Sequence, residues 1–299
     1  MNGIRLLKSL PVANALGESV LWDELGQAFY WTDILGRKLY RYRPDNDRLE
    51  HWDTPQRLCS FGFVAGDDAA LIAAFESGIA LYQPASRSLE WLARPEADVR
   101  GTRFNDGRVD RQGRFWSGTM IEDKLAIDAQ AKPRTASLYR VTSGACAQVA
   151  DGLRITNSLC WSLDSRRLYL ADSPAYTIYV YDFDAATGLP ANRRIFAQNK
   201  APIEPDGSCI DAEDHLWNAQ WRGGKVTRYR PDGVIDTEVL LPVTQPTCVC
   251  FGGPELNWLA VTSAHVELSV SERKQQPLAG ALFIFETPYK GLYESRYSR

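Results

Sequence analysis

The chain has 299 residues, of which 44% are hydrophobic and 24% are charged, with a formal net charge of −3. This is the composition of a globular protein that is long enough to bury a large core. The mildly negative charge disfavours nucleic acid as a partner, because phosphate binding needs clustered Lys and Arg, and no run of 18 or more apolar residues predicts a membrane span.

The first residues give no sign of a targeting segment. Residues 1–20 lack an apolar core long enough for a secretory signal and contain no clear cleavage site. The six cysteines form no CxxC pair, and no histidine lies at zinc-finger spacing from any of them. Several lie in apolar runs such as Thr-Cys-Val-Cys-Phe, where cysteine packs as a small hydrophobic side chain. We expect a cytoplasmic protein with structural cysteines and no disulfide scaffold.

A repeated unit of two strands follows along the chain. Its copies begin at residues 28, 70, 114, 167, 215 and 257, so successive copies start 42 to 53 residues apart. Each copy has a short aromatic-rich strand, a turn of small residues, and a second alternating strand that leads to a turn signal such as Pro-Asp-Gly. A further short apolar strand precedes each copy, as in residues 18–27 and 157–166.

Six such units predict an all-β six-bladed β-propeller. Amphipathic helical stretches, which a doubly wound α/β fold needs between its strands, are essentially absent. We expect a single domain over residues 1–299 without a linker. Residues 4–11 are predicted to add a strand to the last blade and thereby close the ring.

The first unit contains a Tyr-Trp-Thr-Asp motif at residues 30–33. The motif resembles the YWTD propellers of extracellular receptors, which repeat it through most of their blades and are secreted. Here it occurs once, and its counterparts read Phe-Trp-Ser-Gly, Leu-Tyr-Leu-Ala and Leu-Trp-Asn-Ala. The sequence therefore favours aromatic packing between blades over a secreted recognition scaffold.

Polar residues break the apolar pattern at one position of the repeat. With the units aligned on the apolar residue of the second strand, four of them place a carboxylate or carboxamide just before an inner strand begins: Glu18, Asn105, Asn157 and Asp206. Equivalent positions of a propeller converge at one mouth of its channel, where four oxygen-bearing side chains can hold a divalent cation. The alternative is local, because Asn and Asp before a strand also cap turns.

Arg103 lies two residues before Asn105, which places both side chains on the same face of an extended strand. Its guanidinium has two possible uses. One is to clamp a substrate carbonyl or hydroxyl, and the other is to pair with Asp106 or Asp110. The sequence leaves both uses open.

Glu122 and Asp123 follow the second strand of the third unit. They could reach sugar hydroxyls from a loop, or they could be solvated loop charges. None of the three histidines matches a ligand position, and the chain has no glycine-rich phosphate loop and no GxSxG nucleophile elbow.

These residues lie in segments that resemble the gluconolactonase/regucalcin family, also called the senescence marker protein family. The resemblance covers essentially the whole chain, and its most specific block is TRFNDGRVDRQGRFWSGTM at residues 102–120. Residues 16–23, 155–173 and 204–217 also resemble segments of the family. The resemblance implies a six-bladed propeller of sugar-lactone hydrolases with one divalent metal ion in its channel.

The resemblance also implies roles for single residues. Its metal ligands correspond to Glu18, Asn157 and Asp206. Asp206 would also act as the general base, and Arg103 and Asn105 fall on substrate-contacting positions. The substrate-binding glutamate of the family aligns with Asp123, with Glu122 just before it, so either residue could contact the far hydroxyls of the sugar.

We therefore expect metal-assisted hydrolysis of a sugar lactone, an aldono-1,4- or 1,5-lactone of a pentose or hexose, to the aldonic acid. Oxygen ligands suit Ca²⁺, Zn²⁺, Mn²⁺, Mg²⁺ or Fe²⁺. The expected partner is the small-molecule lactone, with no nucleic acid, membrane or obligate protein partner. Three alternatives remain. The first is a hydrolase of the same fold that acts on other esters or organophosphates, and the second is a divalent-metal-binding regulatory propeller without turnover. The third is a secreted recognition propeller, which the missing signal and the cysteine spacing disfavour.

Overall fold

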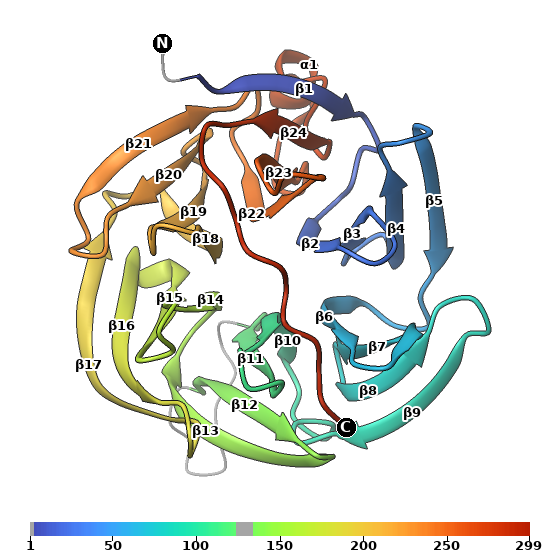
Figure 1. Ribbon diagram of the computed structural model, residues 1–299, viewed down its shortest axis with the longest axis vertical. Coiled ribbons are helices and arrows are strands. Elements are labelled where there is room, and N and C mark those ends of the chain that lie inside the picture. Colours follow the sequence, from blue (N-terminus) through green and yellow to red (C-terminus); the bar gives the residue numbers. More distant parts are fainter. Residues whose placement is uncertain (1–2, 124–133) are drawn as a thin grey trace.

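The structure, a computed structural model, describes residues 3–123 and 134–299. Its strands form six four-stranded antiparallel sheets. Figure 1 shows these sheets arranged as blades around a common axis. This arrangement confirms the predicted all-β six-bladed β-propeller.

Five blades run from the axis to the rim in chain order, and the sixth takes its outermost strand from the N-terminus. The innermost strands are β2 (Gly17–Asp23), β6 (Leu58–Val64), β10 (Thr102–Val109), β14 (Thr156–Trp161), β18 (Glu204–Ile210) and β22 (Pro246–Gly252). The second strands are β3 (Ala28–Asp33), β7 (Asp67–Phe75), β11 (Phe115–Ile121), β15 (Arg167–Asp172), β19 (Leu216–Trp221) and β23 (Trp258–Ser263). The third strands are β4 (Lys38–Arg43), β8 (Gly78–Gln83), β12 (Ala136–Thr142), β16 (Thr177–Asp184), β20 (Lys225–Tyr229) and β24 (Leu282–Glu286). The outermost strands are β5 (Arg48–Asp53), β9 (Ser88–Ala93), β13 (Ala145–Leu153), β17 (Leu189–Gln198), β21 (Ile235–Leu240) and β1 (Arg5–Leu10).

Burial falls from the axis to the rim of the ring. Every residue of β2 and β22 is buried, whereas β5 and β9 contain no buried residue. Trp31 of the Tyr-Trp-Thr-Asp motif is fully buried and stacks on Tyr40 with ring centroids 5.0 Å apart. Both rings belong to a core cluster that also contains residues of β22, β23 and β24. The motif therefore packs the first blade against the last.

The last blade contains both ends of the folded ring. β1 pairs antiparallel with β24, so that Arg5 lies opposite Glu286 and Leu10 lies opposite Leu282. The pairing covers an edge of β24 that would otherwise expose unpaired backbone groups.

A C-terminal strap, residues 288–299, crosses the centre of the ring after β24 (Figure 1). The backbone N–H of Tyr297 donates to the carbonyl oxygen of Phe63 at 2.7 Å. Arg296 forms ion pairs with Asp23 at 2.6 Å and with Glu24 at 3.1 Å. The strap is thereby attached to the first and second blades.

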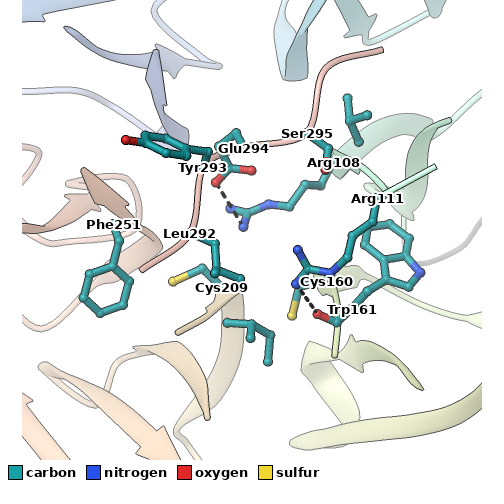
Figure 2. Close-up of a pocket in the computed structure, with 12 residues that line it drawn as sticks. Arg108, Arg111, Cys160, Trp161, Cys209, Phe251, Leu292, Tyr293, Glu294 and Ser295 are labelled. Carbon is teal, nitrogen blue, oxygen red and sulfur yellow. Dashed lines mark hydrogen bonds and ion pairs between the residues drawn. The ribbon is translucent and has the colours of Figure 1, made fainter. Parts of the chain in front are cut away.

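A small cavity of about 40 Å³ lies under the strap, where the innermost strands end. Figure 2 shows Arg108 reaching toward Glu294 of the strap, with an Nη1 to Oε1 distance of 3.5 Å. Cys160 and Cys209 line the same cavity, and all six cysteines of the chain are free thiols. The strap thus covers this end of the channel.

The sequence did not predict the helix α1 (Val270–Gln275), which lies between β23 and β24. A capping box starts it: Ser269 Oγ accepts from the N–H of Glu272 at 3.2 Å, and the Glu272 carboxylate accepts from the N–H of Ser269 at 2.7 Å. Six residues are too few to show an amphipathic pattern. A single 3₁₀ turn, η1 (Ser173–Ala175), follows β15. In the described ranges no helix has the length and apolar character needed to cross a membrane.

Candidate functional site

A cavity of about 650 Å³ opens where the innermost strands begin, at the other end of these strands from the C-terminal strap. Six of the seven site residues predicted from the sequence line it: Glu18, Arg103, Asn105, Glu122, Asn157 and Asp206. Asp123 is not among the described residues that line the cavity. Leu16, Ile155 and Trp221 give the wall apolar surface beside these polar groups. The structure therefore gathers the predicted residues of four blades at one site.

Irregular pairing of the innermost strands accompanies these side chains. In four blades the register between the first and second strands shifts at or beside a site residue: Glu18, Asn105, Asn157 and Asp206. A β-bulge bends a strand and re-aims its side chains. Ser19 and Ser158, which follow two of the site residues, have φ of 51° and 63°, a left-handed backbone that is uncommon without glycine. The site residues thus lie inside the innermost strands, and not before them as the alignment predicted.

Hydrogen bonds join the carboxamides of the third and fourth blades. Asn105 Nδ2 donates to Asn157 Oδ1 and to the carbonyl oxygen of Thr156, both at 2.9 Å. Asn105 Oδ1 accepts from Arg103 Nη1 at 2.8 Å. Asn157 Nδ2 donates to Ser173 Oγ at 2.9 Å. These partners hold both carboxamides in one orientation and use both hydrogens of the Asn105 amide.

Glu122 is held by two arginines at the cavity wall. Arg103 Nε lies 3.1 Å from Glu122 Oε1, and Arg57 donates to both Glu122 oxygens at 2.7 and 2.9 Å. Burial opposes ionisation of Glu122, but the hydrogen bond from Arg57 and the charges of both arginines keep its pKa below the usual value. Among the ion pairs of the described residues, Arg103 has none with Asp106 or Asp110, so the structure does not support that local alternative.

Two carboxylates of the site are buried together. Burial raises the pKa of Glu18 from its ordinary value of 4.5 to about 8, and the charge of Asp106 adds to this shift. Burial also raises the pKa of Asp206 well above its usual range, with further contributions from the Glu18 and Asp106 carboxylates. Asp206 Oδ1 is buried and has no hydrogen-bond partner in the described part of the chain.

This donor set fits a divalent cation. Buried carboxylates are costly unless a positive charge or hydrogen bonds compensate them. Glu18 and Asp206 offer carboxylate oxygens, one of them without a partner, and Asn157 offers a carboxamide oxygen. Hard divalent cations take this combination of ligands.

Asp106 belongs to the same charged cluster, although the sequence did not single it out as a site residue. Its Oδ2 accepts from the N–H of Leu159 and its Oδ1 accepts from the N–H of Gly107, both at 2.9 Å. Its charge contributes, after burial, to the raised pKa of both Glu18 and Asp206. The one available signal in the sequence is that the other three aligned blades have serine or glycine at this position.

A second group of possible ligand atoms belongs to Asp211, Glu213 and His215. Asp211 Oδ2 already accepts from Arg228 Nε and Trp217 Nε1, both at 2.8 Å. Arg228 also pairs with Glu213. An arginine therefore neutralises these carboxylates, and the group stabilises the fifth blade.

The comparisons with known proteins identify the family of the chain. A family profile described as SMP-30/Gluconolactonase/LRE-like region matches residues 16–265, a range that contains every predicted site residue. The chain is 34% identical to the 6-deoxy-6-sulfogluconolactonase of Pseudomonas putida, over 95% of this chain and 96% of that protein. It is also 34% identical to the L-arabinolactonase of Azospirillum brasilense, over 95% of this chain and 93% of that protein. Among solved structures, a calcium-binding protein, regucalcin, from Agrobacterium tumefaciens matches with a TM-score of 0.89 at 30% identity, covering 99% of this chain and 97% of that one.

Proposed function

This chain belongs to the SMP-30/gluconolactonase/LRE-like family, and on that premise we propose that it hydrolyses a sugar lactone to the aldonic acid with one divalent cation. The proposed substrates are aldono-1,4- or 1,5-lactones of a pentose or a hexose. Two relatives, named for lactones of arabinose and of a gluconate derivative, support this class. The observation that carries the proposal is the buried carboxylate pair of Glu18 and Asp206, one of whose oxygens has no hydrogen-bond partner within the described residues.

Glu18, Asn157 and Asp206 would hold the cation, which we propose to be Ca²⁺, Zn²⁺, Mn²⁺, Mg²⁺ or Fe²⁺. What a divalent cation supplies at such a site is Lewis acidity toward the lactone carbonyl. The hydrogen bonds of Asn157 to Asn105 and Ser173 support this assignment, because they fix the side chain before any ligand arrives.

Asp206 acts as the general base. Its carboxylate takes a proton from the attacking water, whose oxygen forms a bond to the lactone carbonyl carbon. The bond between that carbon and the ring oxygen then breaks, and Asp206 returns the proton to the ring oxygen. Because a lactone is an activated ester, the reaction requires no covalent nucleophile.

The residues on the wall orient the substrate. Arg103 directs a cationic donor at the oxygen that gains negative charge, and one such donor typically lowers the barrier by ~3 kcal/mol. Glu122, held by Arg57 and Arg103, accepts from hydroxyl groups of the sugar. Asn105 acts mainly through Asn157, because its amide hydrogens are already used. Asp123 is the alternative contact for the far hydroxyls.

We also infer that residues 1–299 work as one domain, since the site takes side chains from four blades. The direct test is an assay of chelator-treated protein with pentono- and hexonolactones, restoring each cation in turn. Activity that returns with a cation supports the proposal, and activity that survives complete removal of metal contradicts it. Aryl esters and an organophosphate in the same assay separate the alternative hydrolases, and no turnover of any compound would favour a regulatory propeller.

A further inference from the structure

Polar contacts join neighbouring blades near the residues that follow the site side chains. We call the boundary between two neighbouring blades a seam. At four seams hydroxyl groups make these contacts: Ser19 Oγ with the Cys59 carbonyl oxygen (3.0 Å), Ser60 Oγ with Ser117 Oγ (3.1 Å), Ser158 with Ser208, and Thr247 with the Gly17 carbonyl oxygen. Between the third and fourth blades, the carboxylate of Asp106 accepts from the backbone N–H of Leu159. The contacts named at the other four seams join neutral groups. The seam between the third and fourth blades has a neutral contact too, from Thr156 Oγ1 to the Thr119 carbonyl oxygen at 2.9 Å, and adds the charged Asp106 to it.

The Asp106 carboxylate connects two bulges. Its Oδ1 binds the N–H of Gly107, where the register shift of β10 ends. Its Oδ2 binds the N–H of Leu159, which lies inside the register shift between Asn157 and Cys160 in β14. One side chain therefore fixes both strand irregularities that present Asn105 and Asn157 to the cavity.

The charge of Asp106 is unfavourable in the protein without a cation. It adds to the negative potential at Glu18 and Asp206, and its two hydrogen-bond donors among the described residues are backbone amides. Arg108 offsets part of this charge, but Arg108 itself pairs with Glu294 of the C-terminal strap. A serine hydroxyl could accept a hydrogen bond at this seam without the repulsion. A carboxylate becomes favourable here once a cation lies in the cavity.

We propose that Asp106 is a positioning residue for the cation site: it holds the two bulges in place and adds negative charge that strengthens cation binding, without being a ligand. This inference rests on the cation site of the proposed function. Residues that orient metal ligands typically change metal affinity by roughly 10- to 100-fold when they are replaced.

The test compares Asp106→Asn and Asp106→Ser with the parent protein. Isothermal titration calorimetry of the metal-free proteins with Ca²⁺ and with Mn²⁺ should show affinity lower by roughly 10- to 100-fold in both variants. The Tm of the metal-free variants should equal or exceed that of the parent, because a buried carboxylate has been replaced by a neutral group. The Asp106→Ser variant introduces a hydroxyl, the group that makes the contact at the other four seams. It therefore keeps the test valid if the asparagine side chain of Asp106→Asn does not fit.

Ser60→Ala is the matched control, because it removes a hydroxyl from another seam. It should lower the metal-free Tm while cation affinity stays within about twofold of the parent value. The inference is wrong if the Asp106 variants keep the parent affinity, or if their metal-free Tm falls together with affinity, since either result assigns Asp106 a structural role alone. A parent that binds neither of these cations, nor Zn²⁺, Mg²⁺ or Fe²⁺ in the same titration, overturns the proposed cation site and this inference together.

Discussion

Nδ2 of Asn105 donates across 2.9 Å to Oδ1 of Asn157 and joins the third blade to the fourth at the cavity. Ser173 accepts from the other end of the Asn157 carboxamide, so the side chain is fixed at both its oxygen and its nitrogen. The site therefore contains a side chain that is oriented before substrate binds, which lowers the cost of binding.

Replacing Asn105 with alanine should release this side chain. We expect Asn105→Ala to lower kcat/KM by about tenfold or more, because Asn157 loses the donor that orients its oxygen. Steady-state kinetics with a cognate lactone measures this. Asn192→Ala removes an exposed carboxamide of β17 and should leave kcat/KM at the parent value. Parent-like kinetics for Asn105→Ala would show that Asn157 does not depend on it.

Asp206→Asn keeps the shape of the side chain and removes its basicity. We expect kcat to fall by about 10²-fold or more, as is usual when a general base is lost. Circular dichroism should show that the fold is retained. If the variant keeps most of its turnover, another group accepts the proton and the proposed mechanism is incorrect.

Arg57 contacts both oxygens of Glu122 without lining the cavity. In Arg57→Gln, Glu122 loses this two-point contact and keeps only the contact with Arg103 Nε. KM should rise by about tenfold while kcat changes less, as expected when binding that is equal in the ground and transition states is lost. Arg48→Gln removes an exposed arginine of β5 and serves as the control. A change confined to kcat would argue against a role of Glu122 in holding the sugar.

Stability should depend on pH differently with and without cation. Glu18 has a pKa raised from 4.5 to about 8 in the folded protein, so the folded state binds its proton more tightly than the unfolded state. Its contribution to stability is therefore present in full below about pH 4.5 and is lost as the pH rises through 8. We expect the Tm of the metal-free protein to fall between about pH 5 and pH 8. A saturating cation should reverse most of this loss near pH 8. Thermal melts of chelated and cation-loaded protein measure both, and a metal-free Tm that rises over this range would contradict the assignment.

The propeller could be predicted because its unit recurs at a nearly constant spacing and each unit alternates apolar and polar residues. Glu18, Asn157 and Asp206 occupy the same position of the repeated unit. Their proximity could be predicted because equivalent positions of different blades converge on one axis. The bulges could not be predicted in this way. They depend on a local slip in pairing that changes no residue type, and the left-handed backbone at Ser19 and Ser158 has no glycine to mark it.

Contacts between segments that are distant in the sequence could not be predicted either. Arg57 lies 65 residues before Glu122, and the donor to Asp106 is a backbone amide of the next blade. A backbone donor carries no signal in the amino-acid sequence. The partner of Asp106 therefore appears only when the two innermost strands lie side by side.

β1 pairs with β24, and the C-terminal strap is hydrogen-bonded to the ring. Both terminal segments are therefore attached to the blades. Linear arrays of repeats can fray from their end units, because those units have only one neighbour. In this ring every blade has two neighbours, and the closure between β1 and β24 must open before any blade can separate from the others. Denaturation should accordingly be all-or-none, with a high kinetic barrier that protects each blade for as long as the two ends stay docked.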